Sequence, residues 1–308
     1  MRHSSRSSNR NRRCKRGGKV RGCRAGKRKC QTKSERLSKK NFRICFWNCA
    51  SACRRGAVLE RLVHDFDVIC LQETRTTDNK RIPEIPGFKH IQKHEGRGTA
   101  ILYREELHKT TSKVNLNKWS NDHRELMGIR LQKPDQRHNN LVLINAYIHQ
   151  KTHHAAKDWD FIQDIENEFG DTVIICGDLN ARANMWDDQG TNPQGTALED
   201  ALQSCQSIHI APSTPTHIGA RQGDSDSTID LALISPRLKA WANIESLEPH
   251  GSDHLPVVLS LQMPAQQPKT LRSKNPFKYD RRETGVVARL RTKANQANTG
   301  KGLQKKTK

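Results

Sequence analysis

The stretch TVIICGDLN (Thr172–Asn180) is an apolar run that ends abruptly in a carboxylate and an amide. A short apolar run bounded by polar residues is typical of a buried β-strand. FRICFWN (Phe42–Asn48) and DVICLQET (Asp67–Thr74) have the same form, because each is apolar and then turns polar. Polar side chains placed where buried strands end recur in active sites. We therefore expect these three segments to be central strands that carry a site.

The rest of the chain between residues 42 and 263 adds further strands and a few helices. Strand patterns occur at Gly98–Arg104, Leu126–Gln132, Leu141–Ile148, Thr228–Ser235, Trp241–Glu248 and His254–Gln262, and a Pro-rich connection occupies Ile82–Phe88. Apolar residues at helical spacing occur in AVLERLVHDF (residues 57–66), Ala155–Phe169 and Gly195–Cys205. Many strands with few helices predict an α/β fold in which sheets pack face to face and helices lie outside.

The net charge of the chain is unevenly distributed. The 308 residues carry a formal charge of +22, yet residues 42–263 hold 24 basic and 29 acidic side chains. Residues 1–41 hold 17 basic side chains and one acidic one, and residues 264–308 hold 13 and two. Segments of like charge with little apolar content cannot bury enough surface to fold alone. We expect one folded domain at 42–263 between two disordered basic tails.

Composition also restricts the compartment. No apolar run approaches the roughly 20 residues needed to span a bilayer, and the Arg-rich start lacks the apolar region of a secretory signal. Of the nine cysteines, Cys45, Cys70, Cys176 and Cys205 lie in apolar or helix-like segments, as reduced thiols in a core would. Cys45, Cys49 and Cys53 lack a partner pair at zinc-site spacing, so unpaired thiols are favoured. We expect an intracellular protein that does not enter membranes.

Polar residues at or near the strand ends form an ordered series along the chain. The series is Asn48, Glu73, Asn145, Tyr147, Asp178, Asn180, Asp230, Ser252, Asp253 and His254. Any single member has a structural explanation, since Asp and Asn often end strands through side-chain turns. The whole series in this order favours an active site, and its residue types suit hydrolysis of a phosphoester.

Carboxylates in this series suit a hard cation. Mg²⁺ takes one or two carboxylates together with phosphate oxygens and water, which fits Glu73 with help from Asp178 or Asp253. Such a cation neutralises the phosphate and the charge that develops on the leaving oxygen.

The remaining members suit contacts with phosphate and proton transfer. Asn48, Asn180 and Tyr147 can donate hydrogen bonds to nonbridging oxygens. His254 can act as an imidazolium or as a base, with Asp230 on its other ring nitrogen, and Asp178 is the alternative base. Because the chain has no Gly-rich phosphate loop, nucleophile elbow or HExxH helix, we expect direct attack by water.

Six motifs in this order resemble the endonuclease/exonuclease/phosphatase superfamily, whose members include DNase I and apurinic endonucleases. The motifs are WN (47–48), LQET (71–74), NAY (145–147), GDLNA (177–181), STIDLAL (227–233) and SDHLPV (252–257). GDLNAR followed by Trp186, and the SxIDLxL pattern, resemble the apurinic-endonuclease-like domain of jockey-type non-LTR retrotransposons in particular. The resemblance covers residues 42–263.

The resemblance implies a four-layer α/β sandwich with two mainly antiparallel sheets. It implies Mg²⁺ or Mn²⁺ as cofactor and DNA as substrate, nicked to leave a 3′-hydroxyl that primes reverse transcription. The implied catalytic residues are Asn48, Glu73, Tyr147, Asp178, Asn180, Asp230, Asp253 and His254. The implied metal ligands are Glu73, the main one, with Asp178, Asn180 and Asp253. The positions expected near DNA are Arg182, Thr216 and Ser227.

The chain also departs from the family pattern and leaves alternatives open. The usual Pro after NAYI is His149, and too few residues follow Pro264 for a reverse transcriptase, which suggests an isolated or truncated copy of the nuclease part. An apurinic repair endonuclease, another phosphodiesterase or phosphatase, and a noncatalytic nucleic-acid binder remain alternatives. The basic tails suit nuclear import or sequence-independent contact with DNA or RNA, and a mitochondrial transit peptide is less favoured because no apolar face is present. We expect a nuclear monomer.

Overall fold

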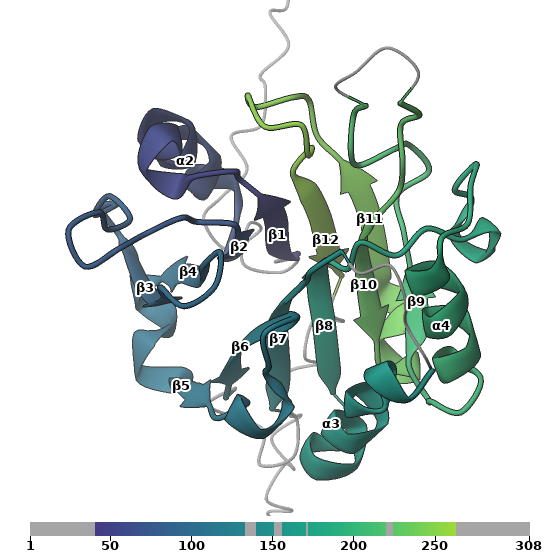
Figure 1. The fold of residues 1–308 in the computed structure, drawn as a ribbon. Helices are drawn as coiled ribbons and strands as arrows, with labels where there is room; N and C mark the ends of the chain where they lie inside the picture. Colours follow the sequence, from purple (N-terminus) through teal and green to yellow (C-terminus); the bar gives the residue numbers. More distant parts are fainter. Residues whose placement is uncertain (1–40, 133–139, 151–155, 171, 220–223, 263–308) are drawn as a thin grey trace, which may run out of the picture.

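The structure is a computed structural model that describes residues 41–132, 140–150, 156–170, 172–219 and 224–262. The described residues form two six-stranded sheets (Figure 1). The first sheet has the order β11 (Ala242–Ser246), β12 (Val257–Leu261), β1 (Phe42–Asn48), β2 (Val68–Gln72), β4 (Thr99–Arg104) and β3 (Phe88–Lys93). The second has the order β5 (Thr111–Val114), β6 (Arg124–Leu131), β7 (Leu141–Ile148), β8 (Val173–Asp178), β10 (Asp230–Ile234) and β9 (Ile208–Ile210). The two basic tails predicted from the sequence lie, apart from Asn41, outside the described residues.

Each sheet has one parallel pair at its centre and antiparallel strands around it. The parallel pair is β1 with β2 in the first sheet and β7 with β8 in the second. The other pairings are antiparallel. The carboxyl ends of two parallel neighbours meet at the same edge of a sheet, so each centre presents two strand ends side by side.

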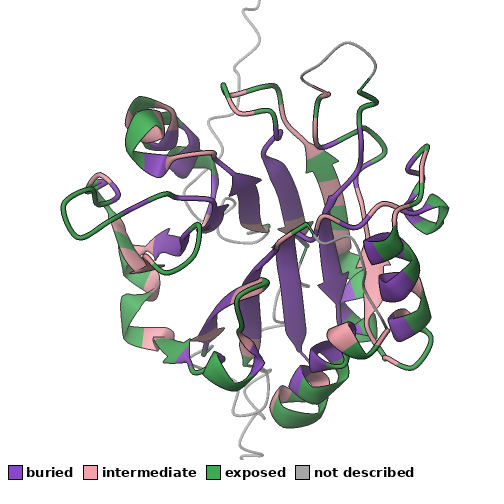
Figure 2. Cartoon of the chain, in the orientation of Figure 1, coloured by how far each residue is buried: buried purple, intermediate pink, exposed green. Residues whose placement is uncertain are grey.

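The apolar side chains form three layers of packing, which makes the molecule a four-layer sandwich. Side chains alternate along β1, with Ile44 and Phe46 in the core between the sheets and Cys45 and Trp47 in the core on the outer face. The 3₁₀ and helical segment that includes α2 (Gly56–Leu62) covers that outer face. On the second sheet, α3 (Phe161–Phe169) and α4 (Pro193–Leu202) cover the outer face. Figure 2 shows central strands that are mostly buried, flanked by helices with both buried and exposed residues and by largely exposed loops. The predicted α/β sandwich is confirmed.

Three strands that the sequence analysis did not predict lie at sheet edges. They are β3, β5 and β9, with the sequences FKHIQK, TSKV and IHI. Edge strands are half exposed and short, so they carry little of the continuous apolar signal that marks buried strands. The nine predicted strands are all present, with ends that shift by up to a few residues.

The helix boundaries differ from the predicted ones for local reasons. A 3₁₀ turn occupies Ala156–Trp159, and α3 begins only at Phe161. The helix predicted at Gly195–Cys205 begins earlier, because the Asn192 side chain accepts a hydrogen bond from the Gly195 amide and Pro193 starts the first turn. Among the described residues, no helix is both long and apolar enough to cross a bilayer.

Candidate active site

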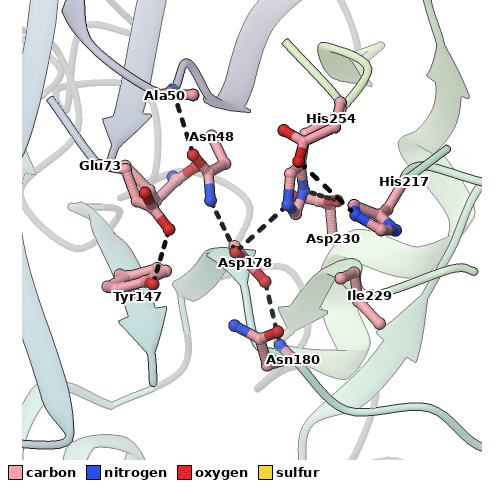
Figure 3. Close-up of polar contacts among 12 residues, drawn as sticks. Asn48, Ala50, Glu73, Tyr147, Asp178, Asn180, His217, Ile229, Asp230 and His254 are labelled. Atoms are coloured by element: carbon pink, nitrogen blue, oxygen red, sulfur yellow. Dashed lines mark hydrogen bonds and ion pairs between the residues drawn. The ribbon is translucent and has the colours of Figure 1, made fainter. Parts of the chain in front are cut away.

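The ends of four central strands meet at one edge of the sandwich. Asn48 ends β1, and Glu73 follows β2 directly in the neighbouring position. In the second sheet, Tyr147 and Asp178 are paired in register near the ends of β7 and β8. The Tyr147 hydroxyl bonds to Glu73, and the Asn48 amide bonds to Asp178, so the two sheets share one site (Figure 3).

Glu73 is held as a carboxylate. Its Oε1 accepts hydrogen bonds from the Tyr147 hydroxyl at 2.8 Å and from Arg97 Nη1 at 3.0 Å, and its Oε2 accepts one from Arg75 Nη2 at 2.5 Å. Burial alone would raise the pKa of Glu73. The hydrogen bonds from Arg75 and Tyr147 and the charge of Arg97 outweigh burial and lower the pKa to about 2. Glu73 therefore carries its negative charge at neutral pH.

Asp178, the last residue of β8, is almost completely buried. Its Oδ2 accepts a hydrogen bond from Asn48 Nδ2 at 2.9 Å, and its Oδ1 accepts one from the Asn180 amide at 3.1 Å. Burial raises the pKa of Asp178 to about 7, and the charge of Asp230 adds to this against the opposing charge of His254. A carboxyl group that titrates near neutral pH can take up and release a proton during a reaction.

Asp230 and His254 form a buried ion pair beside Asp178. His254 Nδ1 lies 2.9 Å from Asp230 Oδ2, and His254 Nε2 lies 3.8 Å from Asp178 Oδ2. Burial would lower the pKa of His254, but the charges of Asp230 and Asp178 outweigh it and raise the pKa to about 10. With this pKa, His254 is an imidazolium at neutral pH.

The backbone around His254 is fixed by two side chains. The Trp47 indole donates a hydrogen bond of 2.9 Å to the carbonyl oxygen of His254. The Ser252 hydroxyl donates one of 2.8 Å to the carbonyl oxygen of Asn48 and accepts one of 3.3 Å from the His254 amide. The loop before β12 is therefore attached to β1, the strand that supplies Asn48.

The site has the donors that a hard divalent cation needs. Donor atoms of Asp178, Asp230 and His254 lie within 4.8 Å of one another. Asp230 Oδ1 is buried and has no hydrogen-bond partner among the described residues, and Glu73 supplies a fixed negative charge nearby. A buried acceptor without a partner is unfavourable unless a cation or a donor binds it. Oxygen ligands of this kind fit Mg²⁺ or Mn²⁺.

Comparison with known protein families agrees with this geometry. A sequence profile of the Endonuclease/Exonuclease/phosphatase family matches residues 45–254, which is more than half of the chain. The chain belongs to this family. Family and fold together indicate a phosphoester hydrolase of the nuclease or phosphodiesterase type.

One similar protein is a polymerase from a mobile element. The RNA-directed DNA polymerase from mobile element jockey of Drosophila melanogaster is 22% identical over 248 residues, which cover 77% of this chain and 25% of that protein. The chain therefore spans about a quarter of the length of this relative. The relationship to jockey-type elements predicted from the sequence is confirmed.

Two solved structures share the fold. The endonuclease domain of TRAS1, a telomere-specific non-LTR retrotransposon, has a TM-score of 0.56 at 15% identity, covering 74% of this chain and all (100%) of that domain. The Xenopus laevis APE2 catalytic domain has a TM-score of 0.52 at 18% identity, covering 73% of this chain and 94% of that one. Both are DNase I-like sandwiches, so the predicted fold class holds for this family member.

The structure brings together seven of the eight predicted catalytic residues. They are Asn48, Glu73, Tyr147, Asp178, Asn180, Asp230 and His254, joined by the contacts above. Asn180 adopts φ of 50°, and its side chain donates to the Ile148 carbonyl oxygen at 2.9 Å. Asp253 lies at the rim, with a side chain 50% exposed and its Oδ2 3.8 Å from His217 Nε2. Its role as a metal ligand, like that of Glu73, Asp178 and Asn180, stays a prediction.

Two of the positions expected near DNA, Thr216 and Ser227, are buried and contact residues next to the site. Thr216 has no exposed surface, and its hydroxyl accepts hydrogen bonds of 3.1 Å from the amides of Ile229 and Asp230. In this structure Thr216 fixes the start of β10, and its contact with DNA stays a prediction. Ser227 is also buried, and its hydroxyl lies 3.3 Å from His217 Nδ1.

Arg182, the third such position, connects two loops beside the site. Its guanidinium group donates to Asp188 Oδ1 at 2.8 and 3.0 Å and to the Ser225 hydroxyl at 3.1 Å. Asp188 in turn accepts a hydrogen bond of 2.7 Å from the Thr228 amide. Direct contact of Arg182 with DNA stays a prediction.

Three residues of the site were not predicted from the sequence. Arg75 and Arg97 contact Glu73, and the ring of His217 packs edge-on against His254 with centroids 4.8 Å apart. The one visible signal for Arg97 is its position between two glycines in EGRG. Asn145, part of the predicted series, donates to the Leu71 and Ala100 carbonyl oxygens at 2.9 and 3.0 Å and so joins the sheets.

Proposed function

We propose that the chain nicks DNA by metal-dependent hydrolysis of a phosphodiester bond. The observation that carries the proposal is the buried Asp230–His254 pair beside Asp178, placed where both sheets end. A hydrolase that uses water directly needs a proton acceptor, a donor to phosphate and a place for a cation. Asp178 and His254 supply the first two, and the ionised Glu73 supplies the third.

The chemistry proceeds in one displacement. A water oxygen forms a bond to phosphorus, and the bond from phosphorus to the 3′-oxygen breaks, which leaves a 5′-phosphate and a 3′-oxyanion that takes a proton from solvent to become a 3′-hydroxyl. Asp178, whose pKa is raised to about 7, is suited to take the proton from water. The imidazolium of His254 is suited to donate to a nonbridging oxygen, whose charge grows in the transition state.

A divalent cation would be held by Glu73, with Asp178, Asn180 and Asp253 as further ligands. When bound, it would neutralise the charge on phosphate and on the leaving oxygen. Asn48 and Tyr147 keep Asp178 and Glu73 in place through hydrogen bonds of 2.9 and 2.8 Å. Because both carboxylates are oriented from the opposite sheet, the geometry of the cation site depends on the packing of the sandwich.

DNA is the proposed substrate because of the relatives. The similar Drosophila protein is named as a polymerase from a mobile element, and the TRAS1 domain is named as the endonuclease domain of a retrotransposon. An enzyme that leaves a 3′-hydroxyl on target DNA supplies the primer that reverse transcription requires. The basic segments 1–41 and 264–308 would add sequence-independent, salt-sensitive contacts with DNA or RNA, and the first would direct nuclear import.

A plasmid-nicking assay tests this function. The full chain with Mg²⁺ is expected to convert supercoiled plasmid to open circles, and His254→Ala and Glu73→Gln are expected to be about 10²–10⁴-fold slower. Glu60→Gln, which removes an exposed charge from α2, is the matched control and should behave as wild type. Wild-type nicking no faster than that of the two site variants would refute the proposal and favour a noncatalytic nucleic-acid binder.

The same protein separates the alternatives within the family. Rates on intact duplex, on duplex with one abasic site and on inositol phosphates should be compared under identical conditions. A strong preference for the abasic duplex would indicate a repair endonuclease. Turnover of inositol phosphates without nicking would indicate a phosphatase.

A further inference from the structure

A short loop from the first sheet carries Arg97 to the central carboxylate. The loop joins β3, which ends at Lys93, to β4, which begins at Thr99. Arg97 Nη1 lies 3.0 Å from Glu73 Oε1, yet the Arg97 side chain remains 53% exposed. The guanidinium group therefore contacts the carboxylate from the solvent side, where a substrate would approach.

The loop is fixed by a carboxylate of the second sheet. Glu125 on β6 accepts hydrogen bonds of 2.8 Å from the Arg97 amide and 3.0 Å from the Gly98 amide. The adjoining Gly96 has φ of 65°, and a Cβ there would lie 2.3 Å from Glu125 Oε1. The positive φ favours glycine at position 96, and a Cβ there would push the Glu125 carboxylate away from the Arg97 and Gly98 amides.

His149 completes this support. Its Nε2 lies 2.7 Å from Glu125 Oε1, and its ring packs against the ring of Tyr147 with centroids 4.8 Å apart. Tyr147 donates to Glu73. Glu125 is thus connected to Glu73 in two ways. One is the series of contacts through His149 and Tyr147, and the other is through Arg97, whose backbone amide Glu125 also holds.

The two arginine partners of Glu73 conflict with its proposed role as a ligand of a divalent cation. Both oxygens already accept hydrogen bonds from cationic groups, Arg97 on Oε1 and Arg75 on Oε2. A divalent cation on this carboxylate would stand next to both guanidinium groups, and like charges at such distances repel strongly in a partly buried site. Binding of the cation therefore favours a conformation in which at least one arginine has left Glu73.

We propose that Arg97 is this arginine, and that it exchanges Glu73 for a nonbridging phosphate oxygen of DNA when a divalent cation binds Glu73. The inference rests on the proposed function. Arg97 is suited to the exchange because Glu125 holds its backbone while its exposed side chain is free to turn. Guanidinium groups bind phosphate oxygens through paired hydrogen bonds. The Arg75 side chain is equally exposed, at 53%, but its hydrogen bond to Glu73 is the shorter one, at 2.5 Å against 3.0 Å, so the exchange is assigned to Arg97.

The exchange couples cation binding to DNA binding. In the free protein, Arg97 competes with the cation for Glu73, so the affinity for the cation is reduced. DNA draws Arg97 away and restores that affinity. By thermodynamic reciprocity, the cation must then increase the affinity for DNA by the same factor. Glu125 is a positioning residue in this scheme, because it acts through Arg97.

The first measurement is Mn²⁺ binding to the DNA-free full chain by calorimetry. Arg97→Gln is expected to bind Mn²⁺ about threefold to fivefold more tightly than wild type, the size expected when a half-exposed ion pair no longer competes. Arg97→Lys, which keeps the charge, should stay close to wild type. Arg61→Gln, which removes an exposed arginine from α2, is the matched control and should have no effect.

The second measurement is the affinity for a short DNA duplex in EDTA and in Mg²⁺, made in a His254→Ala background so that the duplex stays intact. Arg97→Gln is expected to lose most of the gain in affinity that Mg²⁺ brings. Glu125→Gln should also reduce the increase in DNA affinity that Mg²⁺ causes. In a protein that already carries Arg97→Gln, Glu125→Gln should cause no further reduction, because Glu125 acts through Arg97. A purely structural role of Glu125 would instead lower the gain equally in both backgrounds.

The outcomes distinguish this inference from the proposed function. If Glu73→Gln abolishes Mn²⁺ binding and the wild type nicks DNA, but Arg97→Gln behaves as Arg61→Gln in both measurements, the exchange alone is wrong. Weaker Mn²⁺ binding by Arg97→Gln would also overturn it. If the wild type neither binds Mn²⁺ nor nicks DNA, the proposed function and the exchange fail together.

Discussion

The side-chain amide of Asn48 donates a hydrogen bond of 2.9 Å to Asp178, which joins the end of β1 in one sheet to the end of β8 in the other. These residues are 130 positions apart in the sequence. The bond stabilises the ionised form of Asp178 against the burial that disfavours it. Asn48 therefore contributes, after burial and the charges of His254 and Asp230, to the protonation state of the group that we propose as proton acceptor.

Replacing Asn48 by Asp tests this role. Asn48→Asp places a second carboxylate within hydrogen-bond distance of Asp178, and two carboxylates so close cannot both ionise near neutral pH. We expect the nicking rate at neutral pH to fall about 100-fold, a typical loss when a general base is removed. The rise of the rate with pH should move to higher pH. Asn48→Ser, which removes the amide without adding charge, should shift the profile less. An unshifted profile for Asn48→Asp would contradict the assignment of Asp178.

The charge of His254 depends on Asp230. The largest contribution that raises the pKa of His254 to about 10 is the charge of Asp230, with Asp178 second and Asp253 smaller. Proton NMR titration of the metal-free protein should therefore show a His254 pKa that falls strongly in Asp230→Asn and only slightly in Asp253→Asn. Equal shifts in the two variants would show that the buried pair does not control the imidazole.

The same pKa shift predicts how stability changes with pH. The folded protein keeps the His254 proton up to about pH 10, whereas the unfolded chain loses it near 6.5. Between these values the folded state binds more protons, so this contribution to the free energy of unfolding is fully present below pH 6.5 and decreases as pH rises toward 10. Urea unfolding of wild type and Asp230→Asn should show a difference that shrinks from neutral to alkaline pH. If the difference in the free energy of unfolding grew as pH rises, the Asp230–His254 ion pair would not raise the pKa of His254.

The sequence predicted the buried strands and the residues at their ends, and it did so for a physical reason. β1, β2, β7, β8 and β10 are covered on both faces, so their apolar runs are continuous and their polar ends stand out. The edge strands β3, β5 and β9 lack this contrast, and they were missed. The series of candidate catalytic residues could be predicted because its members stand where continuous apolar runs change abruptly to polar residues.

What the sequence could not predict depends on contacts between distant loops. Arg97 reaches Glu73 only because Glu125, on the other sheet, holds its loop. Thr216, expected near DNA, is buried because its hydroxyl is needed by the amides at the start of β10. Neither arrangement leaves a periodic pattern in the sequence, since loop side chains have no fixed spacing to the residues that they contact.

Gly177 of the GDLN motif is expected to be indispensable for the fold. Its φ is 142°, and a Cβ at this position would lie 2.1 Å from the carbonyl oxygen of Ala146 on β7. Because backbone would have to move, Gly177→Ala should lower the free energy of unfolding by about 3 kcal/mol or more. Gly170→Ala is the matched control, since its φ of 78° is also left-handed but no atom lies within 4 Å of the added Cβ. It carries the backbone strain without the clash, so it should cost about 1–2 kcal/mol. Equal costs in urea unfolding would show that β7 and β8 tolerate separation.

Removal of the divalent cation tests the central role of Glu73 both with and without DNA. EDTA should abolish nicking, and Mg²⁺ or Mn²⁺ should restore it. Without DNA, a cation that binds only the folded state stabilises it by mass action, about 2.7 kcal/mol at a hundredfold excess over its dissociation constant. Glu73→Gln keeps the size of the side chain but loses the charge, so its unfolding temperature should hardly respond to Mn²⁺. Glu60→Gln, on the exposed face of α2, should respond as wild type does. If Glu73→Gln is stabilised by Mn²⁺ as much as Glu60→Gln, the cation binds through the carboxylates of Asp178 and Asp230 instead, because these belong to the other described group of donors at the site.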